Sequence, residues 1–213
     1  ALLTGGLLLG MSAQRSNAEY ADAQRQLENI REALIGFAMT NGRLPCPANP
    51  TLASSDAHAG TEDRANAGAA CNRTDGVIPW ATLGLPETDP WGRRFTYFAS
   101  TKFSGPVSTG SLASFTLYTG AIDPFTGNED SAGLANVKED SASTNKIAAD
   151  LPAVVVSHGS NGLGAWQSNG SQLGGASGNE LENANATLTF IQRTPANNFD
   201  DQVIWIAPAI LKS

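Results

Sequence analysis

Apolar positions between residues 14 and 41 repeat with the period of an α-helix. Four large apolar side chains recur at spacings of three, four and three residues: Leu27, Ile30, Leu34 and Phe37. The segment contains no Pro, and Asn41-Gly42 is an ordinary helix stop. The pattern therefore predicts an amphipathic helix over residues 14–41 that packs on a body through these four side chains.

The first 13 residues (ALLTGGLLLGMSA) are uncharged and apolar on all sides. Because nothing at the junction with residue 14 breaks a helix, the simplest prediction is one helix over residues 1–41, roughly 60 Å long. Three interpretations compete for residues 1–13: the end of a longer apolar helix, a signal-peptide remnant, or a core helix. We favour the first, because no basic stretch precedes the run and Met11-Ser12-Ala13 fits a signal cleavage site poorly.

The rest of the chain alternates short strand-like runs with turns. Five runs rich in β-branched and aromatic residues predict an antiparallel sheet: residues 94–99, 114–119, 153–157, 187–192 and 202–207. A turn at Asp89-Pro90-Trp91-Gly92 would begin the first of them. Residues 121–150 and 159–185 read as long surface loops, rich in Gly, Asn and Ser. The expected class is α+β, with a long N-terminal helix on an antiparallel sheet.

Composition narrows the functional classes. The 213 residues include 13 Lys and Arg against 20 Asp and Glu, so the net charge is −7. Such an acidic chain lacks the basic stripe that nucleic acids require, and we expect no nucleic-acid partner. Charged residues at 15% and 22 Gly exclude coiled-coil and collagen compositions, while 41% hydrophobic residues are enough for a core.

The sequence offers little for catalysis. Its only histidines are His58 and His158, and His158 lies beside Ser157 and Ser160 without the G-x-S-x-G pattern of a nucleophile elbow. We therefore predict no catalytic site and no enzymatic activity.

Four segments carry a resemblance: residues 30–47 (IREALIGFAMTNGRLPCP), 76–97 (GVIPWATLGLPETDPWGRRFTY), 153–166 (AVVVSHGSNGLGAW) and 199–211 (FDDQVIWIAPAIL). Together they cover about half of the chain, and in this order the set resembles type IV pilin-like proteins. The resemblance implies a stalk helix over residues 1–41 and a pilin-like head over residues 42–213. In that family the protruding helical halves bundle into the core of an extracellular filament.

Carried over to this chain, the resemblance implies a homo-oligomeric filament at the cell surface. Its core would contain Leu2, Leu3, Leu7, Leu8 and Leu9. An inner-membrane pool would precede assembly, and pilus or secretion machinery would be the further partners. The main alternative is a minor pilin or a pseudopilin of a type II secretion system; a secreted enzyme or carbohydrate-binding domain comes third.

Two cysteines, Cys46 and Cys71, are separated by a long polar loop. An even cysteine count in an exported chain favours a disulfide, which the loop-entropy estimate values at roughly 3 kcal/mol. The alternative is two independent buried thiols. No C-x-x-C or zinc-ligand spacing is present, so no metal or redox role is expected for them.

Two pairs of acidic residues near the C-terminus raise the question of a bound calcium ion. The turn Gly159-Ser160-Asn161-Gly162 together with Glu180 and Glu182 offers oxygen ligands for a hard cation, and major pseudopilins bind calcium in a C-terminal loop. Asp200-Asp201 forms a further pair. Solvated charge is the default interpretation of both pairs. No cofactor is expected, with calcium kept as an alternative.

Overall fold

A computed structural model describes residues 3–116 and 133–212, with only the backbone described for residues 3–13. It begins with the long helix α1, Leu3–Asn41. The helix ends where the sequence predicts: Gly42 has a φ of 65°, and its N–H donates to the carbonyl of Ala38 at 2.8 Å. A side chain at residue 42 would also collide with the carbonyl oxygen of Leu112, so glycine is required there.

The central sheet contains four antiparallel strands in the order β1-β3-β6-β9. They are β1 (Asp75–Val77), β3 (Thr96–Ala99), β6 (Ala153–Ser157) and β9 (Gln202–Ile206). Ser157 at the end of β6 pairs with Gln202 at the start of β9. This register brings the segment that follows β6 beside the segment that precedes β9.

A smaller sheet has the order β5-β4-β8, formed by β4 (Ala135–Lys138), β5 (Lys146–Leu151) and β8 (Thr189–Ile191). The β4–β8 pair is parallel, unlike the all-antiparallel arrangement that the sequence predicts. β2 (Arg93–Arg94) and β7 (Trp166–Gln167) form a separate antiparallel pair. Four short helices complete the described elements: α2 (Trp80–Leu83), α3 (Thr101–Ser104), α4 (Gly178–Ala184) and α5 (Pro208–Leu211).

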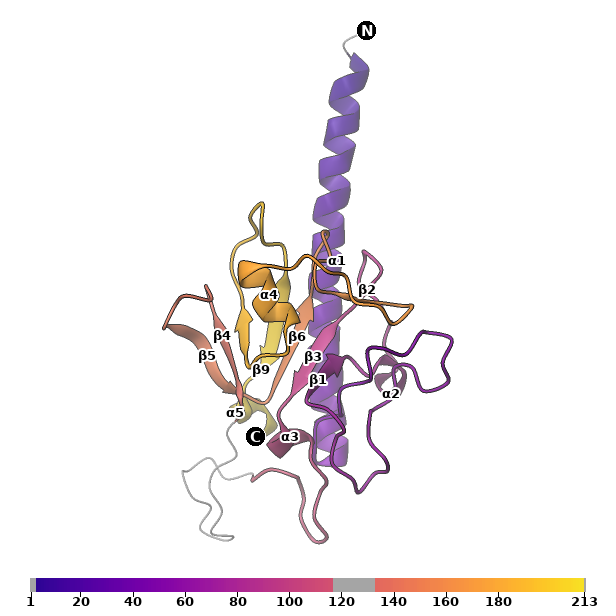
Figure 1. The fold of residues 1–213 in the computed structure, drawn as a ribbon, viewed down its shortest axis with the longest axis vertical. Helices are drawn as coiled ribbons and strands as arrows, with labels where there is room; N and C mark the ends of the chain where they lie inside the picture. The colour runs from indigo at the N-terminus through magenta and orange to yellow at the C-terminus, as the bar shows by residue number, and fades with distance from the viewer. Residues whose placement is uncertain (1–2, 117–132, 213) are drawn as a thin grey trace.

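The central sheet lies between two layers, with α1 on one face and the smaller sheet on the other (Figure 1). Alternate residues of β6 divide between two cores: Val155 packs with Leu27 and Leu34 of α1, and Val154 packs with Phe190 of β8. Because both faces of β6 are covered, all five of its residues are buried. The coarse prediction of an α+β class with a long N-terminal helix and antiparallel strands is confirmed.

Several strand predictions need correction. Residues 114–116 form no strand, although Phe115 is buried against Phe103, and residues 117–119 lie outside the described part of the chain. Residues 121–150, which the sequence pattern predicts as a loop, contain all of β4 and all of β5 except its last residue. That assignment was wrong because β5 is an exposed edge strand whose polar composition resembles a loop.

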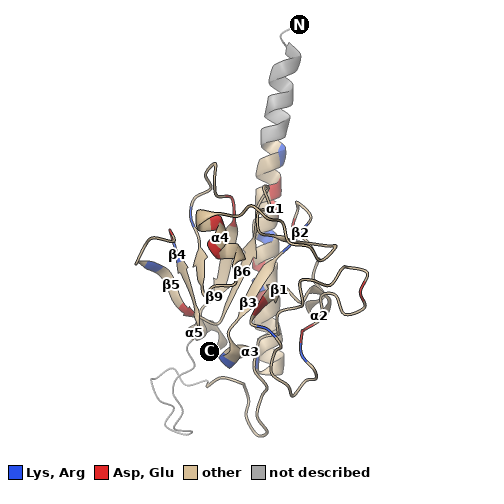
Figure 2. Ribbon diagram, viewed as in Figure 1, with Lys and Arg blue, Asp and Glu red and all other residues tan. Residues whose placement is uncertain are grey.

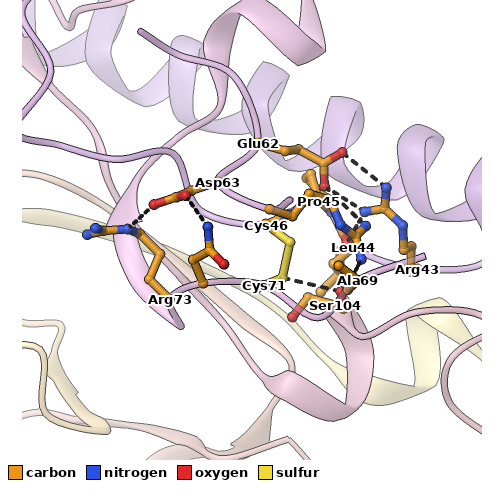
Figure 3. Close-up of a disulfide and its surroundings, with 12 residues drawn as sticks. Arg43, Leu44, Pro45, Cys46, Glu62, Asp63, Ala69, Cys71, Arg73 and Ser104 are labelled. Atoms are coloured by element: carbon orange, nitrogen blue, oxygen red, sulfur yellow. Dashed lines mark hydrogen bonds and ion pairs between the residues drawn. A yellow bond between two sulfur atoms is a disulfide. The ribbon is translucent and has the colours of Figure 1, made fainter. Parts of the chain in front are cut away.

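The predicted disulfide between Cys46 and Cys71 is confirmed, with their Cα atoms 5.4 Å apart (Figure 3). It fixes the loop that follows α1 to the segment that leads into β1. Nearby, the Arg43 guanidinium donates two hydrogen bonds to the Glu62 carboxylate, at 2.6 and 3.0 Å. The Cys46 N–H donates to the same carboxylate at 2.7 Å.

Candidate functional site

The N-terminal part of α1 extends beyond the sheets (Figure 1). Residues 14–18 are exposed, whereas Leu27, Ile30 and Leu34 are buried in the core between α1 and the central sheet. Phe37, the fourth predicted contact, is half-buried with the Arg43 guanidinium 5.2 Å from its ring centroid. Among the helix residues whose side chains are described, the contacts with the head therefore begin at Glu19 and Tyr20.

Two adjacent residues mark the point where α1 leaves the head. Glu19 accepts a hydrogen bond from the indole N–H of Trp91 at 3.2 Å. The Tyr20 ring packs edge-on against Trp91, with centroids 5.0 Å apart, and its hydroxyl donates to Asp200 at 3.4 Å. We call these contacts the neck of the molecule; they join α1 to the turn before β2 and to the segment before β9.

The predicted filament-core residues lie beyond the neck. Leu2 is outside the described residues, and for Leu3, Leu7, Leu8 and Leu9 the structure describes only the helical backbone. In the described part of the chain, no helix meets the length and apolarity needed to cross a bilayer.

A buried carboxylate cluster lies beside the neck. It consists of Glu180, Asp200 and Asp201, each of which offers one carboxylate oxygen within 4.8 Å of those of the other two. Glu180 comes from the first turn of α4, and the two aspartates precede β9. Gly159 permits this approach, because a Cβ atom there would lie 2.4 Å from the carbonyl oxygen of Asp200.

The turn after β6 supplies hydrogen bonds to the carboxylate cluster. Asp200 accepts from the Ser160 hydroxyl at 2.8 Å and from the Asn161 N–H at 2.9 Å, both on Oδ2. The Asn161 amide donates to Glu180 at 2.7 Å. On the other side, Asn183 donates to Asp201 Oδ2 at 2.8 Å. The turn at residues 159–162 and Glu180 thus come together, as the calcium alternative supposes.

Three buried polar atoms at the carboxylate cluster lack hydrogen-bond partners: Asp200 Oδ1, Asp201 Oδ1 and His158 Nδ1. His158 Nδ1 lies 3.7 Å from Asp201 Oδ1, too far for a hydrogen bond. The other ring nitrogen, Nε2, lies 2.8 Å from the Thr96 hydroxyl. Unpaired buried oxygens on adjacent carboxylates are costly, so the cluster needs a proton or a cation.

Without a bound proton or cation, the negative charges of the carboxylate cluster repel one another. Among the ion pairs of described residues, none joins a Lys or Arg to Glu180, Asp200 or Asp201. Burial, and then the charges of Glu180 and Asp200, raise the pKa of Asp201 well above its ordinary value, although the Asn183 hydrogen bond opposes this. Burial lowers the pKa of His158 to about 4, so at neutral pH its imidazole adds no positive charge.

The structure changes the composition of the candidate cation site. Glu182 is not part of the carboxylate cluster, because its carboxylate accepts a hydrogen bond from Thr187 at 3.1 Å instead. Asp200 and Asp201 take its place. The Asp200-Asp201 pair is visible in the sequence, but its proximity to Glu180 depends on the β6–β9 register and on the position of α4.

The geometry around His158 does not activate Ser157 or Ser160 as a nucleophile. The Ser157 hydroxyl donates to Asp89 at 2.8 Å, and the Ser160 hydroxyl donates to Asp200. A serine nucleophile requires a hydrogen bond between its hydroxyl and the imidazole. Neither hydroxyl makes this bond, because His158 Nε2 is hydrogen-bonded to Thr96 instead.

Basic residues are dispersed over the described elements and form no continuous stripe in the view of Figure 2. No family model, curated protein or solved structure matches this chain. The candidate sites therefore rest on their own geometry and chemistry.

Proposed function

We propose that this protein is a structural subunit of a type IV pilus-like extracellular filament, polymerising through its N-terminal helix. The observation that supports the proposal is the helix α1, whose backbone extends well beyond its outermost described contacts with the head, those of Glu19 and Tyr20. The sequence beyond those contacts contains an uncharged, leucine-rich run at residues 1–13. Such an apolar surface requires burial, which copies of the same helix can supply.

Copies of the same helix would provide that burial in a filament. At about 25 cal/mol per Å² of apolar area, a contact of a few hundred Å² supplies several kcal/mol before association costs. Before assembly, the inner membrane would hold the same apolar segment, and pilus or secretion machinery would transfer it into the polymer. Within this class of protein, a minor pilin or a type II secretion pseudopilin is the alternative role.

A charge in the apolar run tests the proposal. We expect Leu8→Asp to abolish filaments sheared from cells and seen by electron microscopy, because the carboxylate would have to be buried between helices. Leu112→Asp is the matched control, since Leu112 is 84% exposed on the head, and filaments should persist. Normal filament abundance with Leu8→Asp would refute the model. Mass spectrometry of the wild-type filaments separates a main component from a minor one.

We further propose that the carboxylate cluster holds a hard divalent cation such as calcium. The supporting observation is the pair of unpartnered buried oxygens, Asp200 Oδ1 and Asp201 Oδ1, beside Glu180. Three carboxylates are oxygen donors of the type that calcium prefers. When bound, the cation would neutralise the cluster, while Ser160, Asn161 and Asn183 keep the carboxylates oriented through their hydrogen bonds.

Thermal unfolding of the chelator-treated protein tests this site. Calcium should raise the melting temperature in a saturable manner, equivalent to about 2.7 kcal/mol at a hundredfold excess over the dissociation constant. Glu180→Gln should abolish most of the rise, and Glu182→Gln on the same helix should retain it. An unchanged melting temperature in the wild-type protein, or an equal rise in both variants, would exclude the proposed site.

A further inference from the structure

The carboxylate cluster and the neck share one short segment of chain. Asp200 and Asp201 belong to the cluster, and Gln202 follows them as the first residue of β9. Two residues of this segment also contact Tyr20 on α1. The Tyr20 hydroxyl donates to Asp200 Oδ2 at 3.4 Å, and the Gln202 side-chain amide donates to the Tyr20 carbonyl at 3.5 Å. The candidate cation site is therefore in direct contact with the point where α1 leaves the head.

The two carboxylate oxygens of Asp200 have different surroundings. Oδ2 accepts hydrogen bonds from the Tyr20 hydroxyl, the Ser160 hydroxyl and the Asn161 N–H, whereas Oδ1 is buried without a partner. A cation bound through Oδ1 would leave all three hydrogen bonds on Oδ2 in place. Cation binding and the Tyr20 hydrogen bond therefore do not compete, and both require the same orientation of the Asp200 carboxylate.

Without a bound cation, the neighbouring carboxylates oppose that orientation. Glu180, Asp200 and Asp201 each place one oxygen within 4.8 Å of the other two, and buried like charges at this separation repel one another. Movement of the Asp200 carboxylate relieves the repulsion, and the same movement stretches the Tyr20 hydrogen bond, the longest of the three on Oδ2. A divalent cation removes the repulsion and so favours the orientation in which the Tyr20 hydrogen bond forms.

Tyr20 also connects the carboxylate cluster to the other side of the neck. Its ring packs edge-on against Trp91, with centroids 5.0 Å apart, and the Trp91 indole N–H donates to Glu19 at 3.2 Å. Residues 14–18, which precede these contacts, are exposed. The position of the Tyr20 side chain therefore decides how firmly this turn of α1 is held against the head.

From these contacts we infer that a divalent cation in the carboxylate cluster fixes α1 to the head at the neck, with the Tyr20 hydroxyl as the link. The inference rests on the proposed cation site. Because coupling between two sites is reciprocal, the cation strengthens the Tyr20 contact by the same factor by which that contact raises the affinity for the cation. In the proposed filament, cation binding thereby holds the head in a fixed position relative to the projecting helix.

Calorimetric titration of the chelator-treated, full-length protein in detergent with calcium tests the link. Tyr20→Phe removes the hydroxyl but keeps the ring that packs against Trp91, so it should fold and bind calcium about threefold or more weakly, the effect of one net hydrogen bond. Tyr97→Phe is the matched control, because it removes a hydroxyl that donates to the Pro45 carbonyl instead, and it should bind calcium with wild-type affinity. Wild-type affinity in Tyr20→Phe would overturn the inference.

Hydrogen exchange followed by mass spectrometry measures the neck directly. In the wild type, calcium should slow amide exchange in peptides covering residues 16–24 by about threefold or more, beyond any change at residues 32–41 near the other end of α1. Glu180→Gln, which lacks a cluster carboxylate, and Tyr20→Phe should lose this local effect. If the wild type binds no calcium, the proposed cation site fails and the inference fails with it. If calcium binds but exchange at residues 16–24 shows no local change, the cation site stands and the inference alone is overturned.

Discussion

At the scale of single residues, the position of His158 follows from strand register. Ser157 pairs with Gln202 in the antiparallel β6–β9 ladder, so the next pair outward brings His158 to Asp201. The imidazole is fully buried and is held through its Nε2 by the Thr96 hydroxyl. Because burial lowers its pKa to about 4, the imidazole lies beside Asp201 in its neutral form at pH 7 and adds no charge to the carboxylate cluster.

The lowered pKa of His158 predicts a dependence of stability on pH. In the folded protein the pKa falls from 6.5 to about 4. The unfolded chain therefore binds more protons between these values, and stability is lost as the pH falls from 6.5 towards 4. At about 1.4 kcal/mol per pH unit, this loss reaches roughly 3 kcal/mol. Asp201 acts in the opposite sense, because its raised pKa makes stability fall as the pH rises above its ordinary value.

Urea unfolding of His158→Gln at pH 7 and pH 4 isolates the histidine contribution. We expect this variant to lose roughly 3 kcal/mol less than the wild type on acidification, because Gln does not titrate. His58→Gln is the control, since it removes the other histidine, and it should follow the wild-type profile. Equal acid sensitivity of wild type and His158→Gln would contradict the assignment.

At the scale of elements, the attachment of α1 depends on one buried face. Leu34 is fully buried between the helix and the central sheet, and Met39, one and a half turns further along, is 82% exposed. We expect Leu34→Ala to reduce the free energy of unfolding by about 2 to 5 kcal/mol, the range for deleting a buried leucine side chain. Met39→Ala should change it by less than about 0.5 kcal/mol. Chemical denaturation measures both, and a similar loss in the two variants would be inconsistent with this packing.

The elements also show how far local sequence determines the fold. The α1 face and strands β6 and β9 have strong apolar patterns, and their positions follow from the sequence alone. β4 and β5 do not, because their stability depends on pairing with each other and with the distant strand β8. The short helix α4 similarly relies on the side chain of Asn183. Its amide NH₂ donates to the Ile191 carbonyl, and its Oδ1 accepts from the Ile191 N–H.

The carboxylate cluster could be predicted only in part for the same reason. Glu180, Asp200 and Asp201 are recognisable as acidic positions in the sequence, but their proximity is set by tertiary structure. The Asp-Asp pair reaches the turn at residues 159–162 through the β6–β9 register, and Glu180 through the docking of α4 against β8. Local sequence instead favours Glu182 as the partner of Glu180, because the two are neighbours along the chain.

At the scale of the whole molecule, the head and the projecting helix depend on different contacts. Both described cores of the head are built from residues between Leu27 and Leu211, and the first described helix contacts, at the neck, are those of Glu19 and Tyr20. Residues 14–18, which precede the neck, are exposed. Folding of the head should therefore be separable from association through the apolar run.

Removing residues 1–13 tests that separation. We expect the chain of residues 14–213 to remain monodisperse in analytical ultracentrifugation without detergent, and to unfold within about 2 °C of the full-length protein, since none of the described core contacts is lost. It should also fail to enter filaments in cells. A control truncation to residues 28–213 removes the neck and Leu27, and should lower the melting temperature by several degrees, because it deletes buried contacts of α1. If the shorter truncation were equally destabilising, residues 1–13 would be part of the folded head, and the proposed division of α1 into a packed portion and an assembly portion would be wrong.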